Sequence, residues 1–314
     1  MNYTKEITKA LAPVEVDGLV ALCCGSTVTL YFEDGHAEKV RQALLGVVNE
    51  YLSWAEGRLT WWFVEGQQFS KVSALQAKDM SRYLLSSKYE EPDSDLKWSF
   101  MWHGGVHKED ASPIRFEALG ASRIESEQHD CLSYIRASFP LDMNSDALHM
   151  TAVRWAQALS AVHGYGGLAM ITSPDIELAS VSEGLVVYRG ERFPGLDVDY
   201  PADHALWTQD GIKGGSWLTI LSDRFVERLG GATRIQQALG TPFALTSYSG
   251  GVVIRAGEEP EIGDRNRNVA TPLSVVLATV LKPIRVKSHP DVSISPEGFD
   301  QDRFERWLAR FDQG

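Results

Sequence analysis

The sequence predicts an α+β fold: a mixed, mainly antiparallel sheet, or sheets, packed with helices in a single compact globular unit. Segments with strand character and segments with helix character follow one another without the regular alternation of a parallel βα repeat. Apolar residues make up 44% of the 314 residues and charged residues 23%, a composition typical of globular proteins. No short repeat and no low-complexity linker divides the chain.

The first elements are expected near the N-terminus. Two short runs of strand-forming residues, 19–24 and 27–32, flank Gly25 and Ser26, which predicts a hairpin with a two-residue turn. A helix is expected from about His36, because apolar residues then recur at helical spacing until Gly57. The apolar face of this helix consists of Val40, Leu44, Val47, Val48 and Tyr51.

The middle of the chain combines strands with one well-marked helix. That helix is capped by Asn144 or Ser145, and Gly164 ends it. Its apolar stripe consists of Leu148, Ala152, Trp155, Leu159 and Val162. A shorter helix is expected over 73–87, and another begins at Pro174 and ends near Arg189. Strands are expected over 60–64, 98–102, 114–119, 132–139 and 168–172.

The last third predicts further elements of both kinds. Residues 243–248 and 252–256 form a hairpin. A strand is expected over 217–221, and helices over 223–229, 232–239 and 273–281. The stretch 287–296 has linker character, and an amphipathic helix follows, with Ser295 and Pro296 as its start signals. Its apolar stripe is Phe304, Trp307, Leu308 and Phe311. We therefore expect one α+β domain over 1–286, and a linker and a C-terminal helix over 287–314. The stripe would dock on the core of the domain or hold a partner.

Charge and cysteine content restrict the partners and the compartment. The chain carries 42 acidic and 30 basic side chains, a formal charge of −12. Such a surface repels nucleic acid and anionic membranes and attracts basic partners, although an acidic balance also simply keeps a protein soluble. Three cysteines, Cys23, Cys24 and Cys131, form neither a CxxC pair nor an even set, which favours a reducing cytosol. No signal peptide and no membrane-spanning run of roughly 18 apolar residues is present.

Motifs that would indicate an enzyme are weak. His103 and His107 have the spacing of two metal ligands on a helix, but the two glycines between them argue against a helix there. His129 and Asp130 would be further candidate ligands. The glycine-rich stretch 163–167 follows a helix, so we interpret it as a helix end rather than a phosphate-binding loop. We expect no catalytic residue, no metal and no cofactor.

Carboxylates gather in three segments rich in proline or glycine. Solvated loops are the simplest interpretation, a surface that meets a basic partner is the main alternative, and an acid–base pair is a third. The clusters are Glu90, Glu91, Asp93 and Asp95, then Asp197, Asp199 and Asp203, and then Glu258, Glu259, Glu261 and Asp264.

Two blocks in the last third carry a family resemblance. The first block covers 211–223 and 229–231, and the second covers 250–268 and continues to Pro272 and the segment 281–285. Together they resemble the bacterial family called type VI immunity for VRR-Nuc. The resemblance spans most of 15–286 and leaves out the tail after 287; Leu273 stands where an aromatic residue would be expected. We interpret the motif residues as structural: Gly214, Gly215, Trp217, Gly230, Gly231, Gly257, Pro260, Gly263 and Asp264.

The resemblance implies function by binding rather than by catalysis. A cytoplasmic immunity protein would bind a cognate toxin effector with a basic nuclease domain and block its DNA-binding or active site. Exposed aromatic residues beside carboxylates are the expected anchors. The expected binding residues are thus Tyr89 and Tyr200 with Glu90, Glu91, Asp93, Asp95, Asp197, Asp199, Asp203, Glu258, Glu259 and Glu261. The alternatives are a binding protein for a non-nuclease toxin and a metal-dependent hydrolase that uses His103, His107 and His129.

Overall fold

A computed structural model describes residues 11–72, 80–91, 94–198, 200–287 and 300–312. The strands are β1 (Val14–Val16), β2 (Leu19–Phe32), β3 (Trp61–Val64), β4 (Ser70–Lys71), β5 (Trp98–His103), β6 (Arg115–Gly120), β7 (Ser133–Phe139), β8 (His163–Thr172), β9 (Leu218–Ser222), β10 (Phe243–Tyr248) and β11 (Gly251–Ala256). The α-helices are α2 (Glu38–Trp54), α3 (Ser81–Leu84), α4 (Arg123–His129), α5 (Ser145–Leu159), α6 (Ile176–Arg192), α7 (Pro201–Trp207), α8 (Asp223–Arg228), α9 (Ala232–Leu239), α10 (Pro272–Leu281) and α11 (Gln301–Leu308).

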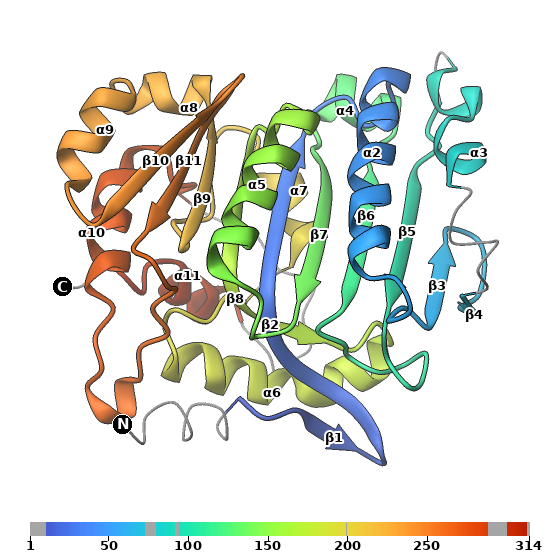
Figure 1. The fold of residues 1–314 in the computed structure, drawn as a ribbon, viewed down its shortest axis with the longest axis horizontal. Coiled ribbons are helices and arrows are strands. Elements are labelled where there is room, and N and C mark those ends of the chain that lie inside the picture. The colour runs from blue at the N-terminus through green and yellow to red at the C-terminus, as the bar shows by residue number, and fades with distance from the viewer. Residues whose placement is uncertain (1–10, 73–79, 92–93, 199, 288–299, 313–314) are drawn as a thin grey trace.

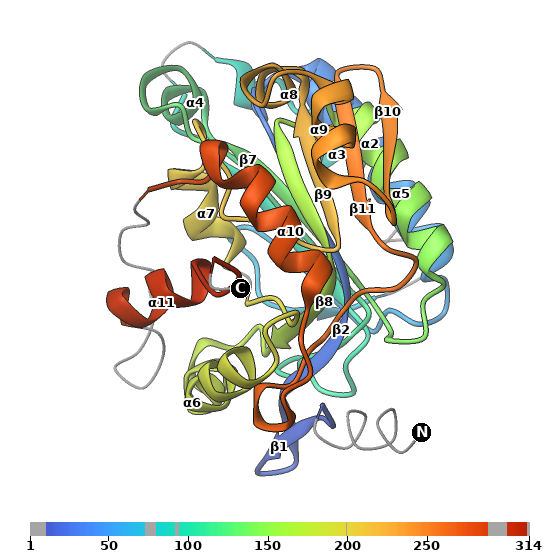
Figure 2. The ribbon, with the colours of Figure 1, turned by 90° about the vertical axis from the view of Figure 1, so that its left-hand side faces the viewer.

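All of these strands belong to one sheet of 11 strands, and every pair of neighbouring strands is antiparallel. The order is β10-β11-β9-β8-β2-β7-β6-β5-β3-β4, and β1 folds back on β2. Helices α2 and α5 lie on one side of the sheet, and α6, α7 and α11 lie on the other side (Figures 1 and 2). The predicted α+β class with a mainly antiparallel sheet is confirmed.

The helices over the main core follow their apolar stripes. In α2 the buried positions include Leu44, Val47 and Tyr51, and in α5 they include Leu148 and Trp155. These side chains join the strand side chains in one large hydrophobic cluster. Burial of this apolar surface fixes both helices against the sheet, since each buried aliphatic or aromatic side chain contributes roughly 1.5–3 kcal/mol.

The predicted hairpin near the N-terminus is wrong, because residues 19–32 form one continuous strand. β2 pairs with β8 from Leu22 to Tyr31 and with β7 from Ser26 to Phe32 without a break in register. Gly25 is needed inside the strand because a Cβ atom there would lie 2.6 Å from the carbonyl oxygen of Phe139. The glycine therefore allows a close approach of two strands and does not form a turn.

The glycine-rich stretch 163–167 is also strand, not the end of a helix. Helix α5 ends at Leu159, and Ser160 follows with a left-handed backbone, φ 49°. Residues 163–167 begin β8 and pair with β2 on one side and β9 on the other. At Gly166 a Cβ would lie 2.9 Å from the carbonyl oxygen of Thr27. Tight packing between adjacent strands therefore explains this glycine.

Two helices begin elsewhere than predicted. α3 covers only Ser81–Leu84, and residues 73–79 of the predicted helix lie outside the described part of the chain. α11 begins at Gln301, where the Asp300 carboxylate accepts a hydrogen bond from the Arg303 N–H at 2.8 Å. The predicted start signals, Ser295 and Pro296, lie outside the described residues, as does most of the expected linker. The domain boundary after residue 286 therefore stays a prediction.

The apolar stripe of α11 packs on the rest of the fold. Phe304, Trp307 and Leu308 are buried in a second hydrophobic cluster. That cluster also contains Val186 and Val187 of α6. The C-terminal helix thus packs on the same side of the sheet as α6.

A buried ion pair attaches α6 to the loop before α10. The Arg192 guanidinium donates to both carboxylate oxygens of Asp264, at 3.1 and 3.0 Å, and Asp264 also accepts from the Asn266 N–H at 3.1 Å. These hydrogen bonds, led by that from Arg192, hold the pKa of the Asp264 carboxyl below its ordinary value. Asp264 is 1% exposed and caps the short turn that follows.

We expect Gly25→Ala to lower the free energy of unfolding by about 1–3 kcal/mol, because the added methyl group collides with the β7 backbone. Chemical denaturation measures the change. Gly46→Ala is the control: a Cβ at this position in α2 meets nothing within 4 Å, so the same substitution should be neutral or stabilising. Equal effects of the two substitutions would contradict the close-approach explanation.

We expect Asp264→Asn to lower the free energy of unfolding by roughly 1.5–3 kcal/mol at pH 7, because a charge-assisted hydrogen-bond pair is lost. A carboxyl with a depressed pKa in the folded state stabilises the protein above its unfolded pKa of about 3.9. That contribution disappears as the pH falls through the lower folded pKa. The difference between wild type and variant should therefore shrink below about pH 4. Asp302→Asn makes the same substitution at an exposed position outside this ion pair and is the matched control.

Candidate partner-binding site

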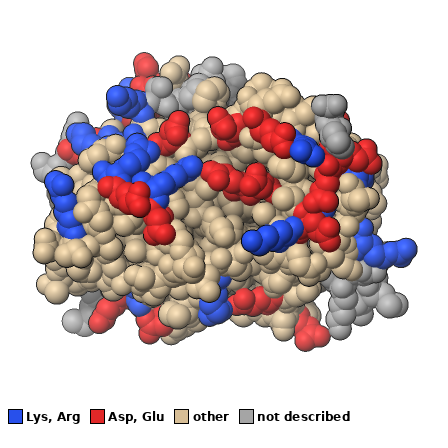
Figure 3. Space-filling model, turned by 90° about the horizontal axis from the view of Figure 1, so that it is seen from above, with Lys and Arg blue, Asp and Glu red and all other residues tan. Residues whose placement is uncertain are grey.

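A hollow of about 360 Å³ opens at the end of the molecule that is uppermost in Figure 1. Four carboxylates and one arginine line it, which gives the lining a formal charge of −3. Its lining residues are Glu33, Asp34, Ser126, Asp130, Cys131, Gln209, Asp210 and Arg224. Figure 3, which looks down on this end, shows carboxylates across the middle and right of the face, and Lys and Arg side chains gathered at the left.

The loop after β2 brings two of these carboxylates to the hollow. Asp34 has a left-handed backbone, φ 56°, and its carbonyl accepts a hydrogen bond from the Ala37 N–H at 2.8 Å. The Trp98 indole N–H donates to the carbonyl of Gly35 at 2.9 Å and fixes the loop to β5. Glu33 and Asp34 therefore project from an anchored turn between the central strand and α2.

Two further segments complete the hollow. Asp130 ends α4 with a left-handed backbone, φ 52°, and its N–H donates to the carbonyl of Glu125. The segment of Gln209 and Asp210 is held by α8: Arg224 donates to the Gln209 carbonyl at 2.5 Å, and Arg228 donates to the Asp210 carbonyl at 2.6 Å. Arg224 also pairs with the Glu33 carboxylate of the hollow at 2.9 Å, whereas the Asp210 side chain stays exposed.

An exposed apolar pair precedes Gln209 and Asp210 of the hollow in the chain. Leu206 and Trp207 end α7 and are each 45% exposed. The Gln209 side chain folds back and donates to the Leu206 carbonyl at 2.6 Å, and the Leu132 N–H donates to the Ala205 carbonyl at 3.1 Å. Trp207 is thus an exposed aromatic residue three positions before Asp210 of the hollow, whereas the sequence predicted such a residue at Tyr89 and Tyr200. Nothing in the sequence distinguishes Trp207 from the buried tryptophans.

The first predicted cluster lies at the same end, but its aromatic residue is in the core. Tyr89 is 1% exposed, so the expectation that its side chain is exposed is wrong. The Glu90 carboxylate accepts a hydrogen bond from the Glu38 N–H at 2.5 Å, at the start of α2. Glu91 and Asp95 are exposed, and Asp93 lies outside the described residues.

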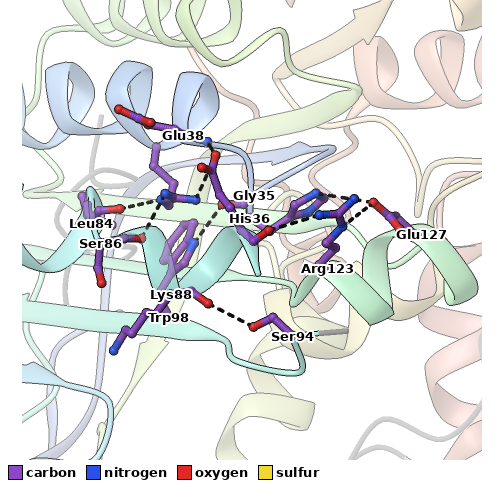
Figure 4. A network of polar contacts seen from close by, with 12 residues as sticks. Gly35, His36, Glu38, Leu84, Ser86, Lys88, Ser94, Trp98, Arg123 and Glu127 are labelled. Atoms are coloured by element: carbon purple, nitrogen blue, oxygen red, sulfur yellow. Dashed lines mark hydrogen bonds and ion pairs between the residues drawn. The ribbon is translucent and has the colours of Figure 1, made fainter. Parts of the chain in front are cut away.

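A polar network connects this cluster to the wall of the hollow (Figure 4). Arg123 of α4 donates to the Glu90 carbonyl at 3.1 Å and to the Glu127 carboxylate at 2.8 Å. The buried Arg41 of α2 donates to the Leu84 carbonyl at 2.5 Å, and burial lowers the pKa of its guanidinium. We call the hollow together with Leu206, Trp207, Glu90 and Glu91 the acidic face. The hydrogen bonds of Arg123 and Arg41 hold the backbone beside this face in place.

The second predicted cluster is largely internal. Asp197 is 5% exposed, because its backbone bridges to Ala169 of β8 and its carboxylate pairs with Lys213 at 2.7 Å. The expectation that Asp197 lies in a solvated loop is therefore wrong. Tyr200 is half-buried against the ring of Phe304, Asp203 is half-buried, and Asp199 lies outside the described residues.

The third cluster lies near the opposite end of the sheet. Glu258 and Glu259 are exposed, and Glu259 accepts a hydrogen bond from the Ser145 hydroxyl at 2.5 Å. Glu261 instead caps α10, because its carboxylate accepts from the N–H groups of Leu273 and Ser274 at 3.0 and 3.1 Å. Glu261 thus stabilises the start of α10, while Glu258 and Glu259 face solvent.

The motif residues of the two blocks make local structural contacts. Five of the motif glycines have a positive φ, a backbone conformation that residues with a side chain rarely adopt: Gly214, Gly230, Gly231, Gly257 and Gly263. Gly230 and Gly231 separate α8 from α9. The chain lies too close to Leu277 for a side chain at Gly215. The buried Trp217 donates from its indole N–H to the Gly257 carbonyl at 3.2 Å, and Pro260 is half-buried.

The three candidate metal-ligating histidines are not brought together. His103 is buried at one end of β5, and burial lowers the pKa of its imidazole to about 4. In the antiparallel pair of β5 and β6, His103 lies opposite the start of β6. His129 ends α4, which follows the end of β6, so it lies at the other end of this strand pair. His107 is exposed in the loop after β5. Across the described ranges, no three His, Cys, Asp or Glu side chains are placed to hold a metal ion.

Within the same described ranges, no helix is long and apolar enough to cross a membrane.

Comparison with known proteins identifies relatives of this fold. The Pseudomonas aeruginosa type VI secretion system (T6SS) protein PA0821 is similar in structure, with a TM-score of 0.85 and 24% sequence identity over 100% of this chain and 91% of that chain. No functionally curated protein matches the chain. The family model described as type VI immunity for VRR-NUC matches residues 43–311. The expectation that the tail after 287 lies outside the resemblance is therefore wrong. Since the match covers most of its length, the chain belongs to the family of type VI immunity proteins for VRR-NUC effectors.

Proposed function

We propose that this immunity protein neutralises its cognate VRR-Nuc effector by binding alone, with the acidic face covering the DNA-binding surface of the nuclease domain. The observation that carries the proposal is the hollow with four carboxylates, together with the exposed Trp207 three residues before Asp210 of its lining. The binding site expected from sequence is thus revised: Glu90 and Glu91 are retained, and Glu33, Asp34, Asp130, Asp210 and Trp207 are added.

Charge complementarity supports this choice of surface. A nuclease groove that binds DNA phosphates carries lysine and arginine side chains. Carboxylates presented by an inhibitor attract such a groove over long distances and increase the rate of association. The carboxylates of the hollow occupy the positions that phosphates would take, so DNA and inhibitor compete for one site.

An aromatic residue beside the charges supplies affinity that charge alone does not. Interface energy concentrates in a few well-packed residues, and tryptophan is enriched among them. Trp207 has about half of its surface available for such packing. The carboxylates around it would then form the polar rim that sets orientation and partner choice.

Co-expression tests the function as a whole. Cells that produce the cognate effector should lose chromosomal integrity, and production of this protein should restore intact DNA and growth, because the nuclease is held in an inactive complex. Survival and DNA integrity are the measurements. Persistent DNA damage without a detectable complex would contradict the proposal.

Charge reversal tests the surface. We expect Asp130→Lys with Asp210→Lys to weaken effector binding at least tenfold and to reduce its dependence on salt. Trp207→Ala should weaken binding about 30-fold or more, the loss typical of an interface hot spot. Calorimetry or surface binding with a catalytically inactive effector measures both effects.

The matched control is Glu258→Lys with Glu259→Lys, which makes the same change of charge in the exposed cluster at the other end of the protein. This variant should bind like wild type. If it loses affinity and the Asp130/Asp210 variant does not, the interface lies at the third cluster instead.

A further inference from the structure

Helix α6 presents an apolar stripe to solvent. Val181 is 59% exposed, Leu185 40% and Tyr188 50%. These positions are spaced by four and three residues, so they lie on one face of the helix. The opposite face is already used, since Val186 and Val187 are buried in the second hydrophobic cluster. The outer stripe therefore has no role in packing this helix on its own sheet.

The comparable surface helix α2 does not share this feature. The exposed positions of α2 include Lys39, Gln42 and Asn49, which are polar. A contiguous exposed apolar surface is characteristic of an interaction site in a folded protein. The contrast indicates that α6 contacts another protein surface.

The centre of the stripe holds a glycine that the fold does not require. Gly184 is exposed, its φ is not in the positive region, and a Cβ there would meet nothing within 4 Å. A glycine within a helix costs roughly 1 kcal/mol relative to alanine. Between Val181 and Leu185 it leaves a gap in an apolar ridge, into which a side chain of an approaching helix fits.

The stripe is complementary to itself when reversed. If a second α6 packs antiparallel about a two-fold axis between Gly184 and Leu185, each Leu185 enters the gap above the other Gly184. Val181 then lies opposite Tyr188, and the exposed Glu177 lies opposite Arg192, whose guanidinium is paired with Asp264 within its own chain. Large meets small and apolar meets apolar, as a two-fold interface requires.

We infer that α6 is the contact of a symmetric homodimer in which two copies of this chain pack antiparallel helices about Gly184. One helix stripe is smaller than the roughly 800 Å² per partner of a standard stable interface. The dimer is therefore weak and depends on concentration. This inference is independent of the proposed function, because α6 lies at the end of the molecule opposite the acidic face (Figure 1).

Cysteine cross-linking tests the two-fold axis. In a Cys131→Ser background, which leaves only the buried Cys23 and Cys24, Gly184→Cys places one thiol beside its copy across the axis. Mild oxidation should convert the variant to a disulfide-linked dimer. Gly46→Cys is the matched control, since it adds a thiol at another exposed helical glycine whose Cβ meets nothing. It should form no disulfide-linked dimer under the same oxidation.

Sedimentation velocity over a range of concentrations measures the unlinked dimer. Wild type should dimerise with increasing concentration, and Leu185→Glu should weaken the association at least tenfold while melting like wild type. A protein that stays monomeric throughout, with no more cross-linking at position 184 than at position 46, overturns the inference. So does a dimer that Leu185→Glu leaves unchanged, or a Leu185→Glu variant that loses only effector binding, which assigns the stripe to the effector.

Discussion

The structure depends on the uninterrupted pairing of β2 with β7 and β8 in the middle of the sheet. A strand of 14 residues spans roughly 45 Å, enough to cross the whole domain. One end of β2 pairs with β1, and the other delivers Glu33 and Asp34 to the acidic hollow. A turn at Gly25 would divide this strand and remove the common support of both ends. The close approach of two backbones at one glycine therefore determines the architecture and the position of the candidate site.

Elements with their own periodic pattern could be predicted, and elements decided by distant contacts could not. The stripes of α2 and α5 and the hairpin of β10 and β11 are visible in the sequence because each is a local pattern. A glycine in a turn and a glycine under a neighbouring strand look the same locally. The group that distinguishes the two cases at Gly25 is the carbonyl of Phe139, which is more than a hundred residues away.

The same ambiguity affects the carboxylates. Side chains that cluster in the sequence were the natural candidates for a binding surface, yet Glu261 caps a helix and Asp197 neutralises a buried lysine. The carboxylates of the hollow instead come from separate segments of the chain, so no run of acidic residues in the sequence indicates the hollow. Its aromatic neighbour could not be identified either, since the exposure of Trp207 depends on how α7 ends. Family membership was readable because the motif blocks are local, whereas the surface that would meet a partner exists only in the folded chain.

The anchoring of the hollow by long-range hydrogen bonds has a thermodynamic consequence. Its walls come from segments around residues 34, 130, 210 and 224, and tertiary contacts hold each of them in place. An unfolded or partly folded chain has no such surface, so a ligand of the hollow binds the native state alone. Mass action then raises the stability of the host by an amount that grows with the ligand concentration relative to its Kd. Occupancy of the hollow would be coupled to the lifetime of the protein, with the free form the first to be lost to proteolysis.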